Sequence, residues 1–376
     1  MDFETLCVHG CKKQYDTVGA VAVPIFTSAT YERFDFDPAA DFEYSRLTNP
    51  TREHLEHTVA ALEGGQFGLA FSSGLAATSV LMELFSPGDH IVSSDDLYGG
   101  THRLFTQISQ KNGVKFTFAN SAESVIAAVT SETKAVFLET PSNPMMQVVD
   151  IAAVAQETKK RGLLLIVDNT FMTPYLQKPL DLGADIILHS ATKYLSGHHD
   201  VLAGVLVLND EKLNERLRII SKTIGSVLSP FDSYLVIRGI KTLPIRMERS
   251  QETTRVIAEW LITRSEIKNV HYIGFESHPS YEITRRQSSG FGAMLSFTMH
   301  DEETTKKLLM GVKVLKFAPS LGGVESLITY PMLQTHGDIP EEERLVRGVD
   351  SCLVRLSIGL ESTKDLIDDL TQALEG

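Results

Sequence analysis

Between residues 67 and 208 the sequence repeatedly places a short apolar run before a longer segment of mixed polarity. The runs are HIVSS (90–94), KFTFA (115–119), KAVFLE (134–139), LLLIVD (163–168), DIILHS (185–190) and VLAGVLVL (201–208). Runs rich in Val, Ile, Leu and Phe, without alternation of apolar and polar residues, are typical of strands buried on both faces. The segments between them have helical spacing. This succession predicts an α/β protein with a mainly parallel, wound sheet.

A second pattern begins after Pro230 and Pro244, where a long helical stretch at 245–262 replaces the alternation. Two further apolar runs, FGAMLSFTM (291–299) and LVRLSIGLE (353–361), and a closing amphipathic helix follow it. We therefore expect three parts, which are an arm (1–48), a large domain (49–244) and a smaller C-terminal α/β domain (245–376).

Charge and cysteine content narrow the range of partners. The 376 residues include 48 acidic and 35 basic side chains, a net charge of −13, which opposes non-specific binding to nucleic acid. No run approaches the roughly eighteen apolar residues of a membrane helix, and the N-terminus does not resemble a signal peptide. Cys7, Cys11 and Cys352 form no even disulfide framework. We expect a cytoplasmic protein that contacts neither membrane nor nucleic acid.

Common ligand-binding motifs are missing. The sequence contains neither G-x-G-x-x-G after a strand nor G-x-x-x-x-G-K-[ST]. His54 and His57 match no zinc signature, and we expect them on a solvated helix face. His198 and His199 beside Asp200 lack a distant partner, so a loop built for another purpose is the better interpretation. We predict no metal site.

The ends of two predicted strands carry the informative side chains. LLLIVD ends in Asp168, and DIILHSATK places Ser190, Thr192 and Lys193 directly after the next run. In open α/β sheets, ligands bind outside the carboxyl ends of the strands. A buried salt bridge would also explain Asp168 or Lys193 taken alone. Together, however, the two suit pyridoxal phosphate, which needs a lysine for a Schiff base and a carboxylate beside its pyridine nitrogen.

A phosphate cradle is also present. FSSGLAATSV places Ser73 and Gly74 immediately before a predicted helix, where free backbone N–H groups and the helix dipole favour an anion. Such a loop alone is common in proteins that bind nothing. The order of cradle, aspartate and Ser-x-Thr-Lys on strand ends is more specific, and hydroxyls of Ser190 and Thr192 are placed to complete the phosphate shell.

The chain resembles the pyridoxal-phosphate enzymes of cysteine and methionine metabolism, which include cystathionine γ-synthase and cystathionine β- and γ-lyases. The resemblance rests on DLYGGT (96–101), ETPSNP (139–144), VDNTFMTP (167–174), HSATKYLSGH (189–198) and SLGGVESL (320–327), and it extends from residue 43 to residue 361. It implies the aspartate-aminotransferase-like type I fold with pyridoxal 5'-phosphate as cofactor. It also implies a homotetramer built as a dimer of dimers.

The resemblance assigns roles to the residues at the strand ends. Lys193 is expected to carry the cofactor and to act as general base, and Asp168 to pair with the pyridine nitrogen. Tyr98 is expected to stack on the cofactor ring and to handle substrate protons, although without the resemblance it is an ordinary turn aromatic. Asn143 is expected near the cofactor's phenolic oxygen and the substrate carboxylate.

Further residues are implied around the phosphate. Gly74 and Leu75 are expected to bind it through backbone N–H groups; relatives usually carry methionine at the second position. Tyr44 and Arg46 are expected to reach the phosphate of the neighbouring subunit, so that a monomer has an incomplete site.

The resemblance also implies three residues that bind the substrate. Arg355 is expected to hold the substrate α-carboxylate through a forked pair of hydrogen bonds, with an inter-strand salt bridge as the alternative. Ser320 is expected to assist beside the same carboxylate. Glu325 matches an acidic position of many γ-acting members, where it would meet a distal substrate ammonium.

Among the reactions of this family, the sequence best fits γ-replacement, in which O-acyl-homoserine and cysteine give cystathionine. The stretch TYPMLQTHGDIPEEER (329–344) resembles bacterial cystathionine γ-synthases. Gly100 stands where methionine γ-lyases carry cysteine, which disfavours methionine as substrate. The alternatives are cleavage of cystathionine and related sulfur amino acids at the β or γ carbon, a non-catalytic cofactor-binding regulator, and an aminotransferase.

Overall fold

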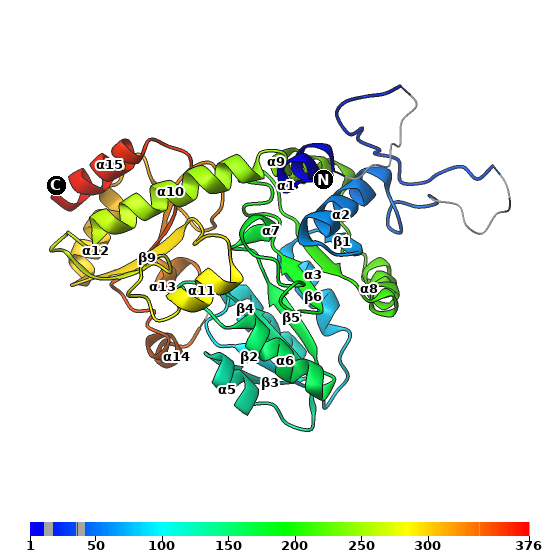
Figure 1. The fold of residues 1–376 in the computed structure, drawn as a ribbon, viewed down its shortest axis with the longest axis horizontal. Helices are drawn as coiled ribbons and strands as arrows, with labels where there is room; N and C mark the ends of the chain where they lie inside the picture. The colour runs from blue at the N-terminus through cyan, green and yellow to red at the C-terminus, as the bar shows by residue number, and fades with distance from the viewer. Residues whose placement is uncertain (11–17, 35, 37–41, 338, 376) are drawn as a thin grey trace.

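The computed structural model describes residues 1–10, 18–34, 36, 42–337 and 339–375 (Figure 1). Cys11 and parts of the predicted arm lie outside these residues. The described residues form two sheets, one of seven strands and one of five.

The large sheet has the strand order β1-β7-β6-β5-β4-β2-β3. Its strands are β1 (Phe67–Phe71), β2 (His90–Ser94), β3 (Lys115–Ala119), β4 (Thr133–Glu139), β5 (Leu164–Asp168), β6 (Ile186–His189) and β7 (Gly204–Leu208). The pairings from β6 through β5, β4 and β2 to β3 are parallel, whereas β7 is antiparallel to both β1 and β6. The mainly parallel sheet predicted from the apolar runs is confirmed, and the carboxyl ends of β1, β4, β5 and β6 lie along one edge.

Both faces of this sheet are covered by helices, as unalternating apolar strands require. Val136 and Leu138 of β4 belong to the core formed with α2 and α6, whereas Phe137 between them belongs to the core formed with α3 and α8. All three side chains are fully buried. Burying one such side chain stabilises the fold by about 1.5–3 kcal/mol.

The helices associated with this sheet and the N-terminal segment precede its strands, connect them or follow the last one. They are α1 (Phe3–His9), α2 (Pro50–Glu63), α3 (Gly74–Met82), α4 (Gly99–Arg103), a π-helix (Leu104–Ser109), α5 (Ala122–Ala127), α6 (Ile151–Arg161), α7 (Thr173–Leu176), α8 (Glu211–Ile224) and α9 (Pro230–Ile240).

The smaller sheet has the order β10-β11-β12-β9-β8 and its own core. Its strands are β8 (Ile267–His271), β9 (Met294–Met299), β10 (Lys316–Phe317), β11 (Leu327–Thr329) and β12 (Leu353–Ser357), and its helices are α11 (Tyr281–Gln287), α12 (Glu302–Gly311), α13 (Pro331–Gln334), α14 (Glu341–Val346) and α15 (Thr363–Glu375). The long helix α10 (Leu243–Leu261) extends from beside α9 toward α15 and packs on α7, β9 and α15 (Figure 1).

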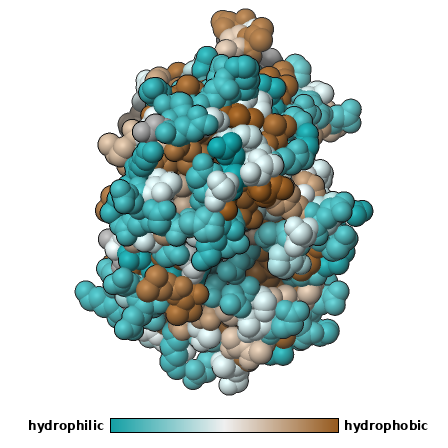
Figure 2. Space-filling view, turned by 90° about the vertical axis from the view of Figure 1, so that its left-hand side faces the viewer, coloured by the Kyte–Doolittle hydropathy of each residue, from teal (hydrophilic) through white to brown (hydrophobic). Residues whose placement is uncertain are grey.

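The outer surface of this end of the molecule is mainly hydrophilic, with hydrophobic side chains in separate groups (Figure 2). Over the described residues, each helix is too short or too polar to span a bilayer.

One sequence expectation about α2 is wrong. His54 was expected on a solvated face, but it is 7% exposed. Its ring lies against Gly10 at the end of α1, where a Cβ on the glycine would come within 2.5 Å of His54 Nε2. Docking of α1 on α2 therefore buries this histidine, and burial lowers its pKa to about 4. The side chain of His57 is 41% exposed, with its Nε2 3.9 Å from Glu53 Oε1.

Candidate active site

A cavity of about 360 Å³ opens at the edge where the parallel strands of the large sheet end. It is lined by Ser73, Gly74, Leu75, Tyr98, Glu139, Asn143, Asp168, Thr170, Phe171, Ser190, Thr192, Lys193, Leu202, Pro319, Ser320, Leu321, Gln334, Thr335 and Arg355. The first thirteen come from the large sheet and its loops, and the last six from segments of the smaller sheet. The cavity therefore has two walls, each built by one sheet.

The anion cradle is formed by the start of α3. Ser73 caps this helix, and its hydroxyl accepts a hydrogen bond from Ala76 N at 3.0 Å. Gly74 follows, and a Cβ on it would lie 3.0 Å from Ser190 Cβ, so glycine allows the helix to approach the strand-end loop closely. The N-terminal N–H groups and helix dipole of this nine-residue helix consequently face the cavity beside a serine hydroxyl.

Asp168 is the last residue of β5 and is oriented by Thr170. The backbone N–H and the hydroxyl of Thr170 both donate to Asp168 Oδ1, at 3.0 and 2.5 Å. Burial raises the pKa of Asp168, while the Thr170 hydrogen bonds and nearby His189 act in the opposite direction. A carboxylate fixed in this way is suited to bind a cationic ring N–H.

Lys193 reaches across the cavity to the other wall. Its Nζ donates to Ser320 Oγ at 2.8 Å. Burial, with a smaller contribution from the charge of Arg355, lowers the pKa of Lys193 to about 8. Ser320 has a φ of 90°, a left-handed conformation that is uncommon for serine and places this residue at the turn entering the cavity.

Arg355 is the centre of the opposite wall. It is 1% exposed, donates from Nη1 to Asn143 Oδ1 at 2.6 Å, and donates from Nη2 to the Ser320 carbonyl oxygen at 2.8 Å. Its Nε has no hydrogen-bond partner. Among the described residues no carboxylate lies within salt-bridge distance of Arg355, so the inter-strand salt bridge weighed from the sequence is not found there. A buried guanidinium with neutral partners alone can bind an anion.

Tyr98 and Glu139 form the floor beside these groups. The backbone N–H of Tyr98 donates to Glu139 Oε2 at 3.0 Å. Burial and the neighbouring charge of Asp168 raise the pKa of Glu139 well above its usual value. A Cβ on Gly100 would lie 2.5 Å from the Tyr98 ring, so any larger residue at position 100 would move this ring.

Eleven of the sequence-predicted site residues line this cavity, and three do not. Tyr44 is 41% exposed elsewhere, and Arg46 stacks on its ring at 5.4 Å and donates to the Lys222 carbonyl oxygen at 2.6 Å. The Glu325 side chain is 55% exposed, with its Oε2 3.9 Å from His199 Nε2.

Eight lining residues were not named as site residues from the sequence, which are Glu139, Thr170, Phe171, Leu202, Pro319, Leu321, Gln334 and Thr335. Two of them make the hydrogen bonds described above. Glu139 and Thr170 lie within motifs that were recognised, at the first position of ETPSNP and two residues after Asp168. Thr170 could have been found, since a threonine two residues after a carboxylate is placed to donate to it. Glu139 gave no signal beyond its place at a strand end.

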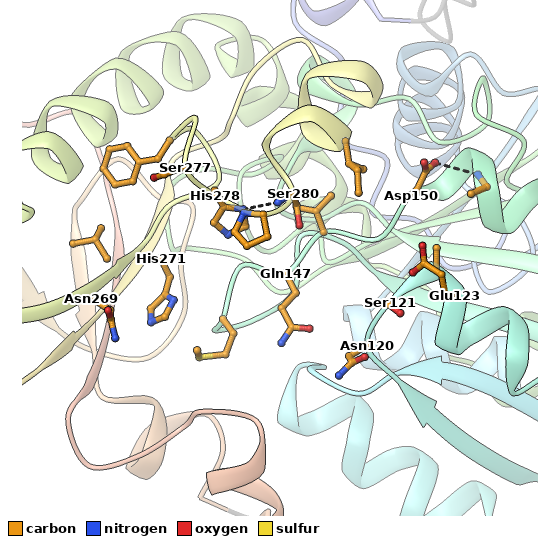
Figure 3. A pocket seen from close by; sticks show the side chains of 18 residues that line it. Asn120, Ser121, Glu123, Gln147, Asp150, Asn269, His271, Ser277, His278 and Ser280 are labelled. Carbon is orange, nitrogen blue, oxygen red and sulfur yellow. Dashed lines mark hydrogen bonds between the residues drawn. The ribbon is translucent and has the colours of Figure 1, made fainter.

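A larger cavity of about 770 Å³ lies away from these groups, between α5, the loop before α6 and the region around β8 (Figure 3). Asn120, Ser121, Glu123, Gln147 and Asp150 face His271, Ser277, His278 and Ser280 across it. His278 Nδ1 accepts from Ser280 N at 3.2 Å, and Asp150 pairs with Arg286 and caps α6. Within the described part of the chain, no cluster of His, Cys, Asp and Glu is suited to hold a metal ion.

Comparison with known proteins gives one family for the whole chain. The family model described as Cys/Met metabolism PLP-dependent enzyme matches residues 4–375. A cystathionine gamma-lyase of Bacillus subtilis is 46% identical over 377 residues, covering 100% of both chains. A cystathionine gamma-synthase of Haemophilus influenzae is 45% identical over 373 residues, covering 98% of this chain and 97% of the relative.

Among solved structures, a cystathionine gamma-lyase from Lactobacillus plantarum complexed with L-serine superposes with a TM-score of 0.97. It is 42% identical, and the match covers 100% of this chain and 99% of that one. The α/β fold expected from the resemblance is therefore confirmed.

Proposed function

The chain belongs to the Cys/Met metabolism PLP-dependent enzyme family, and on that premise we propose that it makes cystathionine from O-acyl-homoserine and cysteine by γ-replacement. Membership establishes the coarser statement directly: this is a trans-sulfuration enzyme that acts on C–S bonds with pyridoxal phosphate as cofactor. The choice of reaction within the family is the proposal.

The residues present fit pyridoxal phosphate. The cradle at Gly74, where a Cβ would fill the space beside Ser190, offers room and N–H groups for a phosphate. We assign phosphate binding to Ser73, Gly74, Leu75, Ser190 and Thr192, and the pyridine nitrogen to Asp168. When bound, the cofactor withdraws electrons from the substrate and makes its Cα and Cβ protons removable.

The observation that carries the substrate assignment is the buried Arg355 without an anionic partner. Its free Nε and its contact with Asn143 leave a positive group aimed into the cavity beside Lys193. We propose that Arg355 and Asn143 bind the α-carboxylate of the amino-acid substrate, with Ser320 beside them. Burial makes this ion pair stronger than it would be in water.

Lys193 is then the group that moves protons. Its lowered pKa makes an appreciable neutral amine population available near pH 8, and its Nζ lies over the cavity where a substrate held by Arg355 would present Cα. We propose that Lys193 Nζ takes the Cα proton and later moves a proton at Cβ. Tyr98, which also lines the cavity, is the second group proposed to exchange protons with the substrate.

In the proposed reaction the Cγ–O bond to the acyl group breaks and a Cγ–S bond to cysteine forms, with the acyl group leaving as a carboxylate. Support comes from the relative named cystathionine gamma-synthase and from residues 329–344, of which Gln334 and Thr335 line the cavity. Glu325 is proposed to meet a distal ammonium group at the exposed rim.

Cleavage of cystathionine at the β or γ carbon is the second candidate. It is favoured by the 46% identity to a cystathionine gamma-lyase and by the close structural match to another gamma-lyase. The same residues would serve, without the thiol addition. The presence of Arg355 and Tyr98 in the cavity argues against a regulator that binds the cofactor without catalysis.

The deciding experiment is a product assay with the purified, cofactor-loaded enzyme. We expect O-acetyl- or O-succinyl-homoserine plus cysteine to give cystathionine, while L-cystathionine alone survives. Pyruvate with homocysteine from cystathionine would establish β-cleavage, and 2-oxobutyrate with cysteine would establish γ-cleavage. Conversion of ordinary amino acids to 2-oxo acids with loss of cofactor absorbance would instead favour an aminotransferase.

We also propose a homotetramer of two dimers, in which Tyr44 and Arg46 complete the neighbour's phosphate site. Their position outside the cavity of their own chain, with Tyr44 41% exposed, leaves them accessible to a second subunit and supports this. The proposed parts of the chain remain an arm (1–48), a large cofactor-binding domain (49–244) and a C-terminal domain (245–376).

We propose that the protein is located in the cytoplasm, which the free thiols of Cys7 and Cys352 support. Cell fractionation tests this location.

A further inference from the structure

His336 is a buried histidine that the proposed reaction does not use. It follows α13 on the smaller-sheet side and is 1% exposed. Its ring nevertheless contacts the large-sheet side, because Nε2 lies 3.1 Å from the Asn143 carbonyl oxygen and the backbone of Leu97 is near enough to act on the pKa of the ring. One side chain therefore joins the loops that carry Asn143 and Tyr98.

The partners fix which ring nitrogen carries the proton. A carbonyl oxygen can only accept, so His336 Nε2 must be the N–H that donates to Asn143. Nδ1 lies 2.8 Å from Thr335 Oγ1, and in the neutral ring it accepts a hydrogen bond from this hydroxyl. Both nitrogens are thereby satisfied, and the ring is held in one orientation.

The neighbouring residues pack just as closely. A Cβ on Gly99 would lie 2.3 Å from the Thr335 carbonyl oxygen, so the Tyr98 turn and the 334–336 loop touch backbone to backbone. Gln334 and Thr335 line the active-site cavity, whereas His336 lies behind it.

We propose that His336 is a positioning residue, which holds the Asn143 loop and the Tyr98 turn against the smaller sheet so that Asn143 stays paired with Arg355 for carboxylate binding. This inference rests on the proposed role of Arg355 and Asn143. It assigns to His336 an effect on the affinity for the substrate carboxylate.

The electrostatic surroundings favour the neutral ring that this role needs. Burial and the charge of Arg355 lower the pKa of His336 to about 4, and Arg347 acts in the same direction. An imidazolium would place a second positive charge beside Arg355, where the structure offers neutral carbonyl oxygens instead.

The test measures glycine binding to the cofactor-loaded enzyme through the change in cofactor absorbance, with glycine amide as the ligand that lacks a carboxylate. In His336→Asn, whose side chain is too short to reach the Asn143 carbonyl, we expect the glycine Kd to rise about tenfold. The Kd values for glycine amide and for pyridoxal phosphate should stay within about twofold. His336→Gln can place an amide N–H near Nε2, and it should recover most of the glycine affinity.

The matched control is His278→Asn, a histidine of the same part of the chain that lines the other cavity; its glycine affinity should be unchanged. Unchanged glycine affinity in His336→Asn, or equal weakening of glycine and glycine amide, would overturn the proposal. Gly99→Ala provides a second test, since its methyl group separates the same loops with His336 intact. If His336→Asn does not fold, wild-type-like glycine binding by Gly99→Ala overturns the proposal.

Glycine binding is independent of the reaction catalysed. A failure to make cystathionine would therefore reject the γ-synthase proposal and leave the role of His336 standing, whereas unaltered glycine binding would reject only the latter.

Discussion

Lys193 Nζ and Ser320 Oγ are 2.8 Å apart, although the first follows a strand of the large sheet and the second precedes a strand of the smaller one. The amine that carries the proposed chemistry is therefore held by the opposite wall of its own cavity. Any relative movement of the two sheets would change the environment of this amine.

The lowered pKa of Lys193 predicts how the cofactor-free enzyme takes up pyridoxal phosphate. Attachment requires the neutral amine, so its rate should rise with pH and level off near pH 8, whereas an ordinary lysine would show a rise continuing beyond pH 10. Stopped-flow absorbance of the bound cofactor measures this profile. Ser320→Ala should move the midpoint to lower pH, because the hydroxyl accepts a hydrogen bond from the ammonium form.

The same shift has a consequence for the stability of the cofactor-free protein. The unfolded chain binds a proton at this lysine up to about pH 10.4, and the folded chain loses it near pH 8. Between these values the unfolded state holds more protons, so the contribution of Lys193 to stability increases as the pH rises. A Lys193→Met variant should lack this contribution in thermal unfolding followed from pH 7.5 to 10.5.

Replacing Arg355 with lysine removes the forked donor geometry and leaves the positive charge. We expect KM for the amino-acid substrate to rise by about two orders of magnitude with the cofactor still bound, because one ammonium cannot reproduce two parallel hydrogen bonds. Steady-state kinetics and the cofactor spectrum measure the two effects separately. An unchanged KM would refute carboxylate binding by Arg355.

Thr170→Val should weaken cofactor binding, because it removes the hydroxyl that orients Asp168 while keeping the side-chain shape. We expect the Kd of pyridoxal phosphate to rise about three- to tenfold, which corresponds to the loss of one ordinary hydrogen bond. Thr158→Val in α6, whose hydroxyl donates only within its own helix, is the matched control. Equal Kd values for the two variants would reject the role of Thr170.

The proposed sharing of sites between subunits can be tested by complementation. Arg46→Ala and Lys193→Ala should each be poorly active alone, since one damages the neighbour's site and the other its own. Refolding the two together should restore about a quarter of the wild-type activity, because half of the dimers are hybrids and each hybrid has one intact site. No gain on mixing would contradict a shared site.

Acid should destabilise the enzyme partly through His336. Its folded pKa of about 4 lies below the ordinary histidine value, so the unfolded state binds more protons as the pH falls below about 6.5. Its favourable contribution is present above pH 6.5 and is lost progressively toward pH 4. The groups that face the ring are Arg355, Arg347 and two backbone carbonyl groups. The melting temperature of His336→Gln should therefore vary less over this range than that of the wild type.

Six of the seven strands of the large sheet followed from the sequence as apolar runs, whereas β1 (Phe67–Phe71) was not predicted. The run at β3 was expected to be buried on both faces, but Lys115 and Thr117 are exposed because β3 lies at the edge of the sheet. Asp168 and Lys193 were placed correctly by the same logic, since strand ends in a parallel sheet share an edge. Tyr44, Arg46 and Glu325 were named from resemblance alone, and in a single chain they lie outside the cavity. Their proposed contacts need a second subunit or a bound substrate.

The sequence could not indicate what depends on distant packing. His54 stands in a polar helical pattern, and only the docking of α1 through Gly10 buries it. His336 lies in a short stretch with no periodicity, and its two partners are some 190 and 240 positions away in loops that only the fold brings together. Local patterns carry no information about such contacts.

The two walls of the cavity come from different sheets, and the smaller sheet has a core of its own in addition to the two that flank the large sheet. The large-sheet wall supplies the groups proposed to hold the cofactor, and the smaller-sheet wall supplies Arg355, Ser320 and Thr335 on the substrate side. Contacts across the cavity, such as those of Lys193 with Ser320 and of Arg355 with Asn143, join the two walls. Residues of the smaller-sheet wall can therefore be substituted to accept another molecule while the cofactor-holding groups stay unchanged, provided that these contacts are kept.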